Sequence, residues 1–188
     1  MSNYYFLSGK VNKQSVFAYS VIDADPDLDL LPKLLKKDKL NFSFILKPKK
    51  INTGTSNKMW SDYQPNNYAW PLMSEKLMAI INEKLTGKEK IIWMSVFVKY
   101  KTEKRQYYIP RFEKKLDLIN KNKTIYGYSK KSIICPVFSM EKIQSFSMFY
   151  TPQVYWQISP SLFVNEEIKI SIEEAKLVGI NFSRAAVL

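Results

Sequence analysis

The chain carries one pattern twice, in LMSEKLMAIINEKL at residues 72–85 and in FVNEEIKISIEEAKL at residues 163–177. In both stretches an apolar pair precedes a small polar residue, Ser74 or Asn165, which is followed by glutamate and by apolar residues at helical spacing. A serine or asparagine side chain accepts a hydrogen bond from the free amides of a first helical turn, and glutamate there lies near the positive end of the helix dipole. The pattern predicts two similar amphipathic helices, at about residues 74–86 and 165–177.

Segments rich in aromatic and β-branched residues surround these helices and predict β-strands. They include residues 3–8, 15–22, 41–46, 90–100, 105–110, 124–129 and 132–138. Several lie next to each other between the two predicted helices, which favours antiparallel pairing over a doubly wound parallel sheet. We therefore expect an α+β fold in which the two helices pack on a mostly antiparallel sheet.

The length of 188 residues suits a single α+β domain. Two lobes within it are the alternative. Residues 1–58 would then hold the N-terminal strands and a basic loop, and residues 59–188 would hold both predicted helices.

The composition excludes several kinds of chemistry, because the chain has no histidine, one cysteine and five glycines. It lacks the base of the Ser-His-Asp and Cys-His nucleophile systems, and a single cysteine cannot supply the usual zinc ligands. We predict a protein without enzymatic activity, metal or cofactor. Carboxylate-only chemistry stays open. Its densest candidates are on the second helix, where they are more typical of a solvated face: Glu166, Glu167, Glu173 and Glu174.

Two other groups have ordinary structural interpretations. The alternating aspartates of residues 23–29 resemble a calcium loop, but leucines replace the glycine and the glutamate that an EF-hand requires. These residues predict a loop followed by a short helix. Cys135 lies in an apolar run before Pro136, and we expect it to be a small buried hydrophobe.

The formal net charge is +12, which indicates an acidic partner. All but three of the 29 basic residues are lysines, the exceptions being Arg105, Arg111 and Arg184. Arginine is the residue suited to planar, bidentate recognition of phosphate and guanine. The charge therefore permits nucleic-acid binding, through Lys47, Lys49, Lys50 and neighbouring lysines, without favouring it.

Aromatic residues gather in two segments, residues 60–70 and 146–156. They can pack over the edge of the core, or they can be exposed anchors for a partner, since tryptophan and tyrosine are enriched at binding hot spots. The candidate partner-binding residues are Trp60, Tyr63, Tyr68, Trp70, Phe149, Tyr150, Tyr155 and Trp156.

The N-terminal sequence MSNYYFLSGKVNK lacks the basic start and apolar core of a secretory signal. No apolar run reaches the roughly 18 to 20 residues that span a bilayer. We expect a cytoplasmic protein without a membrane partner.

The chain resembles a group of bacterial immunity proteins from polymorphic-toxin systems. The resemblance covers about residues 59–188 and includes QYYIPRFEKKLDLI and the closing SLFVNEEIKISIEEAKLVGINF. The closing pattern matches at Leu162, Phe163, Asn165, Glu166, Ile168, Leu177, Gly179, Ile180 and Phe182. The matching residues are of structural types, and the first 58 residues take no part in the resemblance.

The resemblance implies a non-catalytic protein that binds and neutralises one cognate toxin domain. Immunity proteins against nucleases are often acidic, and a charge of +12 has the opposite sign. We therefore expect a toxin partner with an acidic surface and no small-molecule substrate. The alternative function is a basic nucleic-acid-associated protein.

Overall fold

The computed structural model describes residues 3–10, 16–21, 43–47, 60–128, 132–152 and 157–188. Within them the helices are α2 (Glu75–Glu83), α3 (Met140–Ile143) and α4 (Glu166–Glu174). The strands are β1 (Tyr4–Gly9), β2 (Phe17–Ser20), β3 (Ser43–Lys47), β4 (Tyr63–Gln64), β5 (Leu72–Ser74), β6 (Ile91–Tyr100), β7 (Glu103–Phe112), β8 (Ile125–Tyr126), β9 (Ile133–Cys135), β10 (Val137–Phe138), β11 (Met148–Tyr150), β12 (Leu162–Asn165), β13 (Ile180–Arg184) and β14 (Ala186–Val187).

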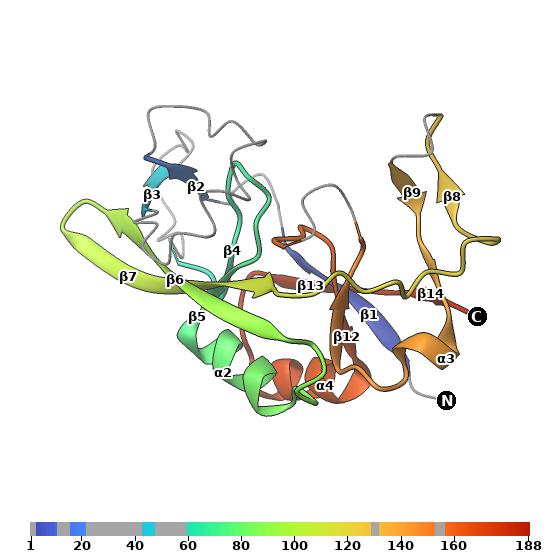
Figure 1. Cartoon of the computed structure of the whole chain (residues 1–188). Coiled ribbons are helices and arrows are strands. Elements are labelled where there is room, and N and C mark those ends of the chain that lie inside the picture. Colours follow the sequence, from blue (N-terminus) through green and yellow to red (C-terminus); the bar gives the residue numbers. More distant parts are fainter. Residues whose placement is uncertain (1–2, 11–15, 22–42, 48–59, 129–131, 153–156) are drawn as a thin grey trace.

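Two larger sheets organise these strands. One has the order β2-β3-β6-β7-β5-β4, and the other has the order β11-β12-β1-β13. Figure 1 shows α2 and α4 side by side beneath the sheets, with the long β6–β7 hairpin extending to one side and the β8–β9 hairpin rising on the other. Pairing is antiparallel except between β3 and β6 and between β10 and β14.

The two helices begin where the sequence predicts. The Ser74 side chain accepts a hydrogen bond from the amide of Leu77, and the Asn165 side chain accepts one from the amide of Ile168. Each cap directly follows a strand that is buried in the core, so it fixes the point at which the chain turns from strand to helix. Both helices end earlier than predicted, at Glu83 and Glu174.

The two sheets contain the same arrangement of four strands and one helix. The first repeat is β4-β5-α2-β6-β7, with strand order β4-β5-β7-β6. The second repeat is β11-β12-α4-β13 completed by β1, with strand order β11-β12-β1-β13. The strand that corresponds to β7 therefore comes from the opposite end of the chain, so the second repeat is a circular permutation of the first.

The pairing registers of the two repeats also agree. Tyr63 opposite Met73 corresponds to Met148 opposite Val164, Ser74 opposite Tyr107 corresponds to Asn165 opposite Tyr4, and Ile91 opposite Phe112 corresponds to Ile180 opposite Gly9. A hydrogen bond repeats as well. The Tyr107 hydroxyl donates to the Ser61 carbonyl at 2.8 Å, and the Tyr4 hydroxyl donates to the corresponding Phe146 carbonyl at 3.3 Å.

The core has three parts, and the repeats share the central one. Leu77 and Ile81 of α2 pack there with Ile168 and Ile172 of α4. The outer face of each sheet carries its own cluster, around Phe44 and Val98 in the six-stranded sheet and around Phe138 and Phe163 in the four-stranded one. Burial of this apolar surface, at about 25 cal/mol per Å², is the main force holding the repeats together.

Polar contacts between the repeats are reciprocal. The Val178 amide, in the second repeat, donates to the Asp62 carboxylate at 2.8 Å, next to the first repeat. At the corresponding position on the other side, the Ser147 amide donates to the buried Glu89 carboxylate at 2.8 Å. Both contacts join the turn before the first strand of one repeat to the turn before the third strand of the other, as in a two-fold symmetric dimer. The hydrogen bonds themselves are not symmetric, because both carboxylates belong to the first repeat and both amides to the second.

The mixed, mostly antiparallel architecture is confirmed, and three details differ from expectation. The short helix α3 was not expected. The strands of residues 1–58 do not stay together, since β1 joins the four-stranded sheet while β2 and β3 join the six-stranded one. Cys135, expected to be buried, is exposed at the end of β9 in the two-stranded β8–β9 sheet.

Gly179 is the glycine whose replacement we expect to cost most stability. Gly179 and Gly87 both have positive φ, 80° and 81°, which costs an alanine about 1–2 kcal/mol. An added Cβ at Gly179 would also lie 2.6 Å from the Ser61 Cβ and 3.1 Å from the Tyr63 carbonyl oxygen, whereas Gly87 has nothing within 4 Å. Urea unfolding should show that Gly179→Ala lowers the free energy of unfolding by about 1–3 kcal/mol more than Gly87→Ala does. Equal losses would show that the contact between the repeats at Gly179 is not tight.

Candidate functional site

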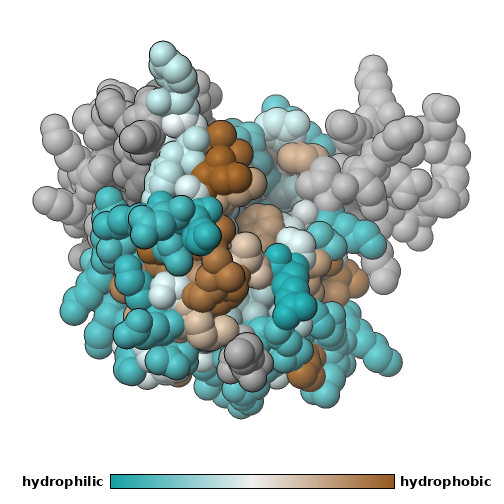
Figure 2. All heavy atoms as spheres, turned by 90° about the vertical axis from the view of Figure 1, so that its right-hand side faces the viewer, coloured by the Kyte–Doolittle hydropathy of each residue, from teal (hydrophilic) through white to brown (hydrophobic). Residues whose placement is uncertain are grey.

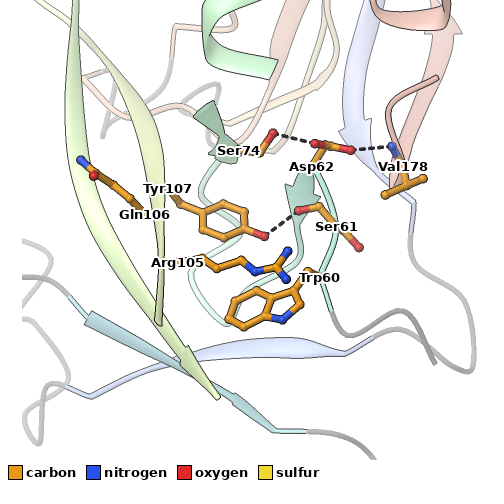
Figure 3. Close-up of a pocket in the computed structure, with 8 residues that line it drawn as sticks. All are labelled: Trp60, Ser61, Asp62, Ser74, Arg105, Gln106, Tyr107 and Val178. Atoms are coloured by element: carbon orange, nitrogen blue, oxygen red, sulfur yellow. Dashed lines mark hydrogen bonds between the residues drawn. The ribbon is translucent and has the colours of Figure 1, made fainter. Parts of the chain in front are cut away.

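A pocket of about 210 Å³ opens where β7, the segment before β4 and the turn before β13 meet. Figure 3 shows Arg105 and Tyr107 pointing from β7 toward it, while Gln106 points to the other side of the strand. The alternation follows from the two-residue period of a strand. The pocket is lined by Trp60, Ser61, Asp62, Ser74, Arg105, Gln106, Tyr107 and Val178.

Asp62 fixes one wall of the pocket. Its carboxylate accepts hydrogen bonds from the Ser74 hydroxyl at 2.7 Å and from the Val178 amide at 2.8 Å (Figure 3). Its backbone amide donates to the Val178 carbonyl, and its carbonyl accepts from the Ser74 amide. The carboxylate oxygens are therefore occupied by structural donors, and Asp62 ties the cap of α2 to the second repeat.

Tyr107 forms the floor. Its hydroxyl donates to the Ser61 carbonyl, and its ring lies 6.4 Å from the Trp60 ring in a stacked orientation. Burial raises the pKa of Tyr107 above its ordinary value. The phenol therefore remains a protonated donor at neutral pH and holds the segment that carries Trp60.

Trp60, Arg105 and Glu103 form a network at the mouth of the pocket. The indole Nε1 of Trp60 donates to Glu103 Oε2 at 2.9 Å, and Arg105 Nη2 lies 2.6 Å from Glu103 Oε1. The Arg105 guanidinium lies 4.4 Å from the centre of the Trp60 ring. Hydrogen bonds from Arg105 first and Trp60 second lower the pKa of the Glu103 carboxyl. The arrangement presents a tryptophan and an arginine in fixed positions, with half of the Arg105 side chain exposed.

A second hollow, of about 420 Å³, lies beside the β8–β9 hairpin and is lined by Leu116, Ile119, Tyr126 and Ile133 among others. On this side of the molecule, apolar side chains form an interrupted band within a hydrophilic surround (Figure 2). The hairpin itself exposes Ile125 and Ile134.

The acidic residues of α4 are separated into different contacts. Glu166 accepts hydrogen bonds from Asn3 and Tyr5, Glu167 pairs with Lys84, and Glu173 pairs with Lys169. Within the described residues, no three carboxylates or thiolates lie close enough together to hold a metal ion. None of the helices in this part of the chain has the length and apolar character needed to cross a bilayer.

Of the predicted partner-binding residues, Trp60 lies in the pocket network. Tyr68 is partly buried against Phe44 and Trp70. Tyr155 and Trp156 lie outside the described residues, as do the aspartates of residues 23–29 and the lysines at 49 and 50.

Four of the predicted anchors are not exposed, and for these the expectation of a free surface is wrong. Tyr63, Trp70, Phe149 and Tyr150 are all core residues with at most 5% of their surface exposed. The polar end of Tyr150 is also used within the chain, since its hydroxyl donates to the Lys114 carbonyl and accepts from the Leu116 amide. Aromatic content identified these segments without showing which face of each strand is buried.

Arg105, Glu103 and Tyr107 were not among the predicted site residues. Their spacing of two along β7 is a usable signal, because it places all three on one face of the strand. Nothing in the local sequence indicates that Trp60, more than forty residues earlier, lies against that face.

Comparisons with known proteins add no family to this picture. No protein-family model matches the chain, and no curated protein matches its sequence.

The network at the mouth of the pocket predicts the titration of Glu103. Arg105→Gln should raise the pKa of the Glu103 carboxyl toward its ordinary value, because it removes the largest stabilising contact. Trp60→Phe should raise it by less. Because its pKa is lowered in the folded state, the Glu103 carboxylate adds to the stability of the fold at pH values above its unfolded-state pKa. This contribution is lost as the pH falls through the lowered folded-state pKa. Carbon-detected NMR titration measures these values. Trp93→Phe is the control, since the Trp93 indole donates to Asn82 instead, and a shift there as large as in Trp60→Phe would contradict the assignment.

Proposed function

We propose that this chain is a non-catalytic immunity protein of a bacterial polymorphic-toxin system, which binds and neutralises a cognate toxin domain in the cytoplasm. The resemblance over residues 59–188 supports this function. In this proposal the two similar amphipathic helices and the sheets above them are the rigid scaffold, and binding takes place on the surface around it.

The observation that carries the proposal is the Trp60–Arg105 pair. Tryptophan and arginine are enriched among the residues that dominate protein interfaces. Here the guanidinium lies against the indole, and Glu103 holds both side chains by hydrogen bonds. Side chains that are already fixed lose less conformational entropy on binding, so the pair is suited to tight association.

The charge of the chain supports an acidic partner surface. At a net charge of +12, electrostatic attraction would speed encounter with an acidic toxin domain and repel basic ones. An inhibitor that competes with nucleic acid for the basic groove of a nuclease needs a negative charge, which is the opposite of the charge of this chain. We therefore propose that neutralisation works by covering an acidic functional surface of the toxin.

Co-expression with the toxin domain encoded by a neighbouring gene tests the function. The chain should protect the cells, and Trp60→Ala or Arg105→Ala should weaken the measured affinity for that domain by about ten- to a hundredfold. Arg184→Ala is the matched control, because Arg184 is an exposed arginine that hydrogen-bonds to Asn3 in the second repeat.

Two results would count against this function. One is that the chain neither binds nor protects against the neighbouring toxin domain. The other is retention on DNA or RNA that falls steeply with rising salt, which would favour the alternative of a nucleic-acid-associated protein.

A further inference from the structure

The six-stranded sheet has a second surface, on the side of the β6–β7 hairpin that faces away from the pocket. Direct pairing places Tyr19 beside Ile45, Ile45 beside Lys99, and Lys99 beside Lys104, in one row across β2, β3, β6 and β7. Phe97 and Gln106 form the adjacent pair two residues along the same strands. We call these six residues the open face: Tyr19, Ile45, Phe97, Lys99, Lys104 and Gln106.

Three of the six residues of the open face have apolar or aromatic side chains, although they are exposed. Tyr19, Ile45 and Phe97 have 38%, 40% and 40% of their surface exposed. The residues between them along the strands point the other way and are buried, as Val96 and Val98 are. Helix α2 covers the Ile91 end of this side of the hairpin, but these three residues lie beyond it. Contiguous exposed apolar residues with a polar rim are the usual anatomy of a protein-binding surface.

The open face also carries positive charge. Lys99 and Lys104 are directly opposite each other on paired strands, an arrangement of like charges that destabilises a sheet. Glu103 is the only acidic residue between positions 91 and 112, and it is held on the pocket side of the hairpin by Trp60 and Arg105. The face therefore keeps an unfavourable pair of positive charges that a partner with carboxylates would neutralise.

The contacts of the rings favour a protein over stacked nucleic-acid bases. Lys104 Nζ lies 3.6 Å from the centre of the Phe97 ring, and Lys47 Nζ lies 5.2 Å from that of Tyr19. Base stacking needs free ring faces, whereas one face of each of these rings already has an ammonium group over it. Ile45, between them, offers no ring at all. We propose that the open face is a docking surface for an acidic protein segment, whose apolar side chains contact Tyr19, Ile45 and Phe97 and whose carboxylates face Lys99 and Lys104.

This proposal does not depend on the partner being a toxin, and it is tested on the full chain with a defined probe. The probe is a short fluorescent peptide of alternating glutamate and leucine, followed by anisotropy. Peptides of alternating glutamate and serine, and of alternating lysine and leucine, separate the charge from the apolar contribution. A thymidine oligonucleotide tests the nucleic-acid alternative.

We expect saturable binding of the glutamate–leucine peptide, and weaker or no binding of the other three probes. Lys104→Glu and Phe97→Ser should each weaken it by about tenfold or more. Lys104→Glu should leave stability nearly unchanged, because an attraction to Lys99 replaces a repulsion and offsets the lost contact of the ammonium group with the Phe97 ring. The matched controls are Lys88→Glu and Ile170→Ser, which change exposed residues elsewhere and should alter the affinity by less than about twofold.

Four results would overturn the proposal. They are the absence of saturable peptide binding, equal effects of the open-face and control variants, tighter binding of the oligonucleotide through the same residues, and self-association of the chain that Phe97→Ser abolishes. Peptide binding at the open face without protection against the neighbouring toxin would remove the proposed function and leave the docking surface standing.

Discussion

The structure depends on the contact between α2 and α4, which pack their apolar faces into one core shared by both repeats. Each helix also packs on strands of its own repeat, α2 on β5 and β7 and α4 on β12 and β1, so the helix pair joins the two sheets. Two hydrogen bonds, from the Val178 amide to Asp62 and from the Ser147 amide to Glu89, also fix the orientation of one repeat against the other. Because Asp62 also lines the pocket, the geometry of the pocket is set by the same contact.

The β6–β7 hairpin gives one chain two chemically different surfaces. Arg105 and Tyr107 line the pocket and Glu103 lies on the same side of β7, while the side chains of Lys104 and Gln106 lie on the other side, in the open face. Strand β7 thereby has the hydrogen-bonded network of Trp60, Arg105 and Glu103 on one side and the open face, with its lysines and apolar residues, on the other. The segregation of Glu103 to the pocket side matters most, because it leaves the other side without a negative charge from this hairpin.

Local patterns predicted the helix starts and most strands, because capping and strand propensity act within a few residues. Ser74 and Asn165 are examples, since their side chains cap the helices that their neighbours predict. The pairing of strands could not be predicted in this way. The pairs Tyr4-Tyr5 and Tyr107-Tyr108 occupy equivalent positions in the two repeats, but they lie in opposite halves of the chain. Tyr150 and Phe149 show the same limit for the site, since composition marks an aromatic segment and only tertiary packing decides its exposure.

The permuted connection of β1 has a consequence for how the protein is made. The first repeat uses residues 63–112 and is complete when the ribosome has released them. Strand β1 emerges before all of these, yet both of its neighbours, β12 and β13, lie at the end of the chain. Until β12 and β13 have been made, the nascent polypeptide therefore carries an apolar strand with two vacant edges, and such edges favour mispairing.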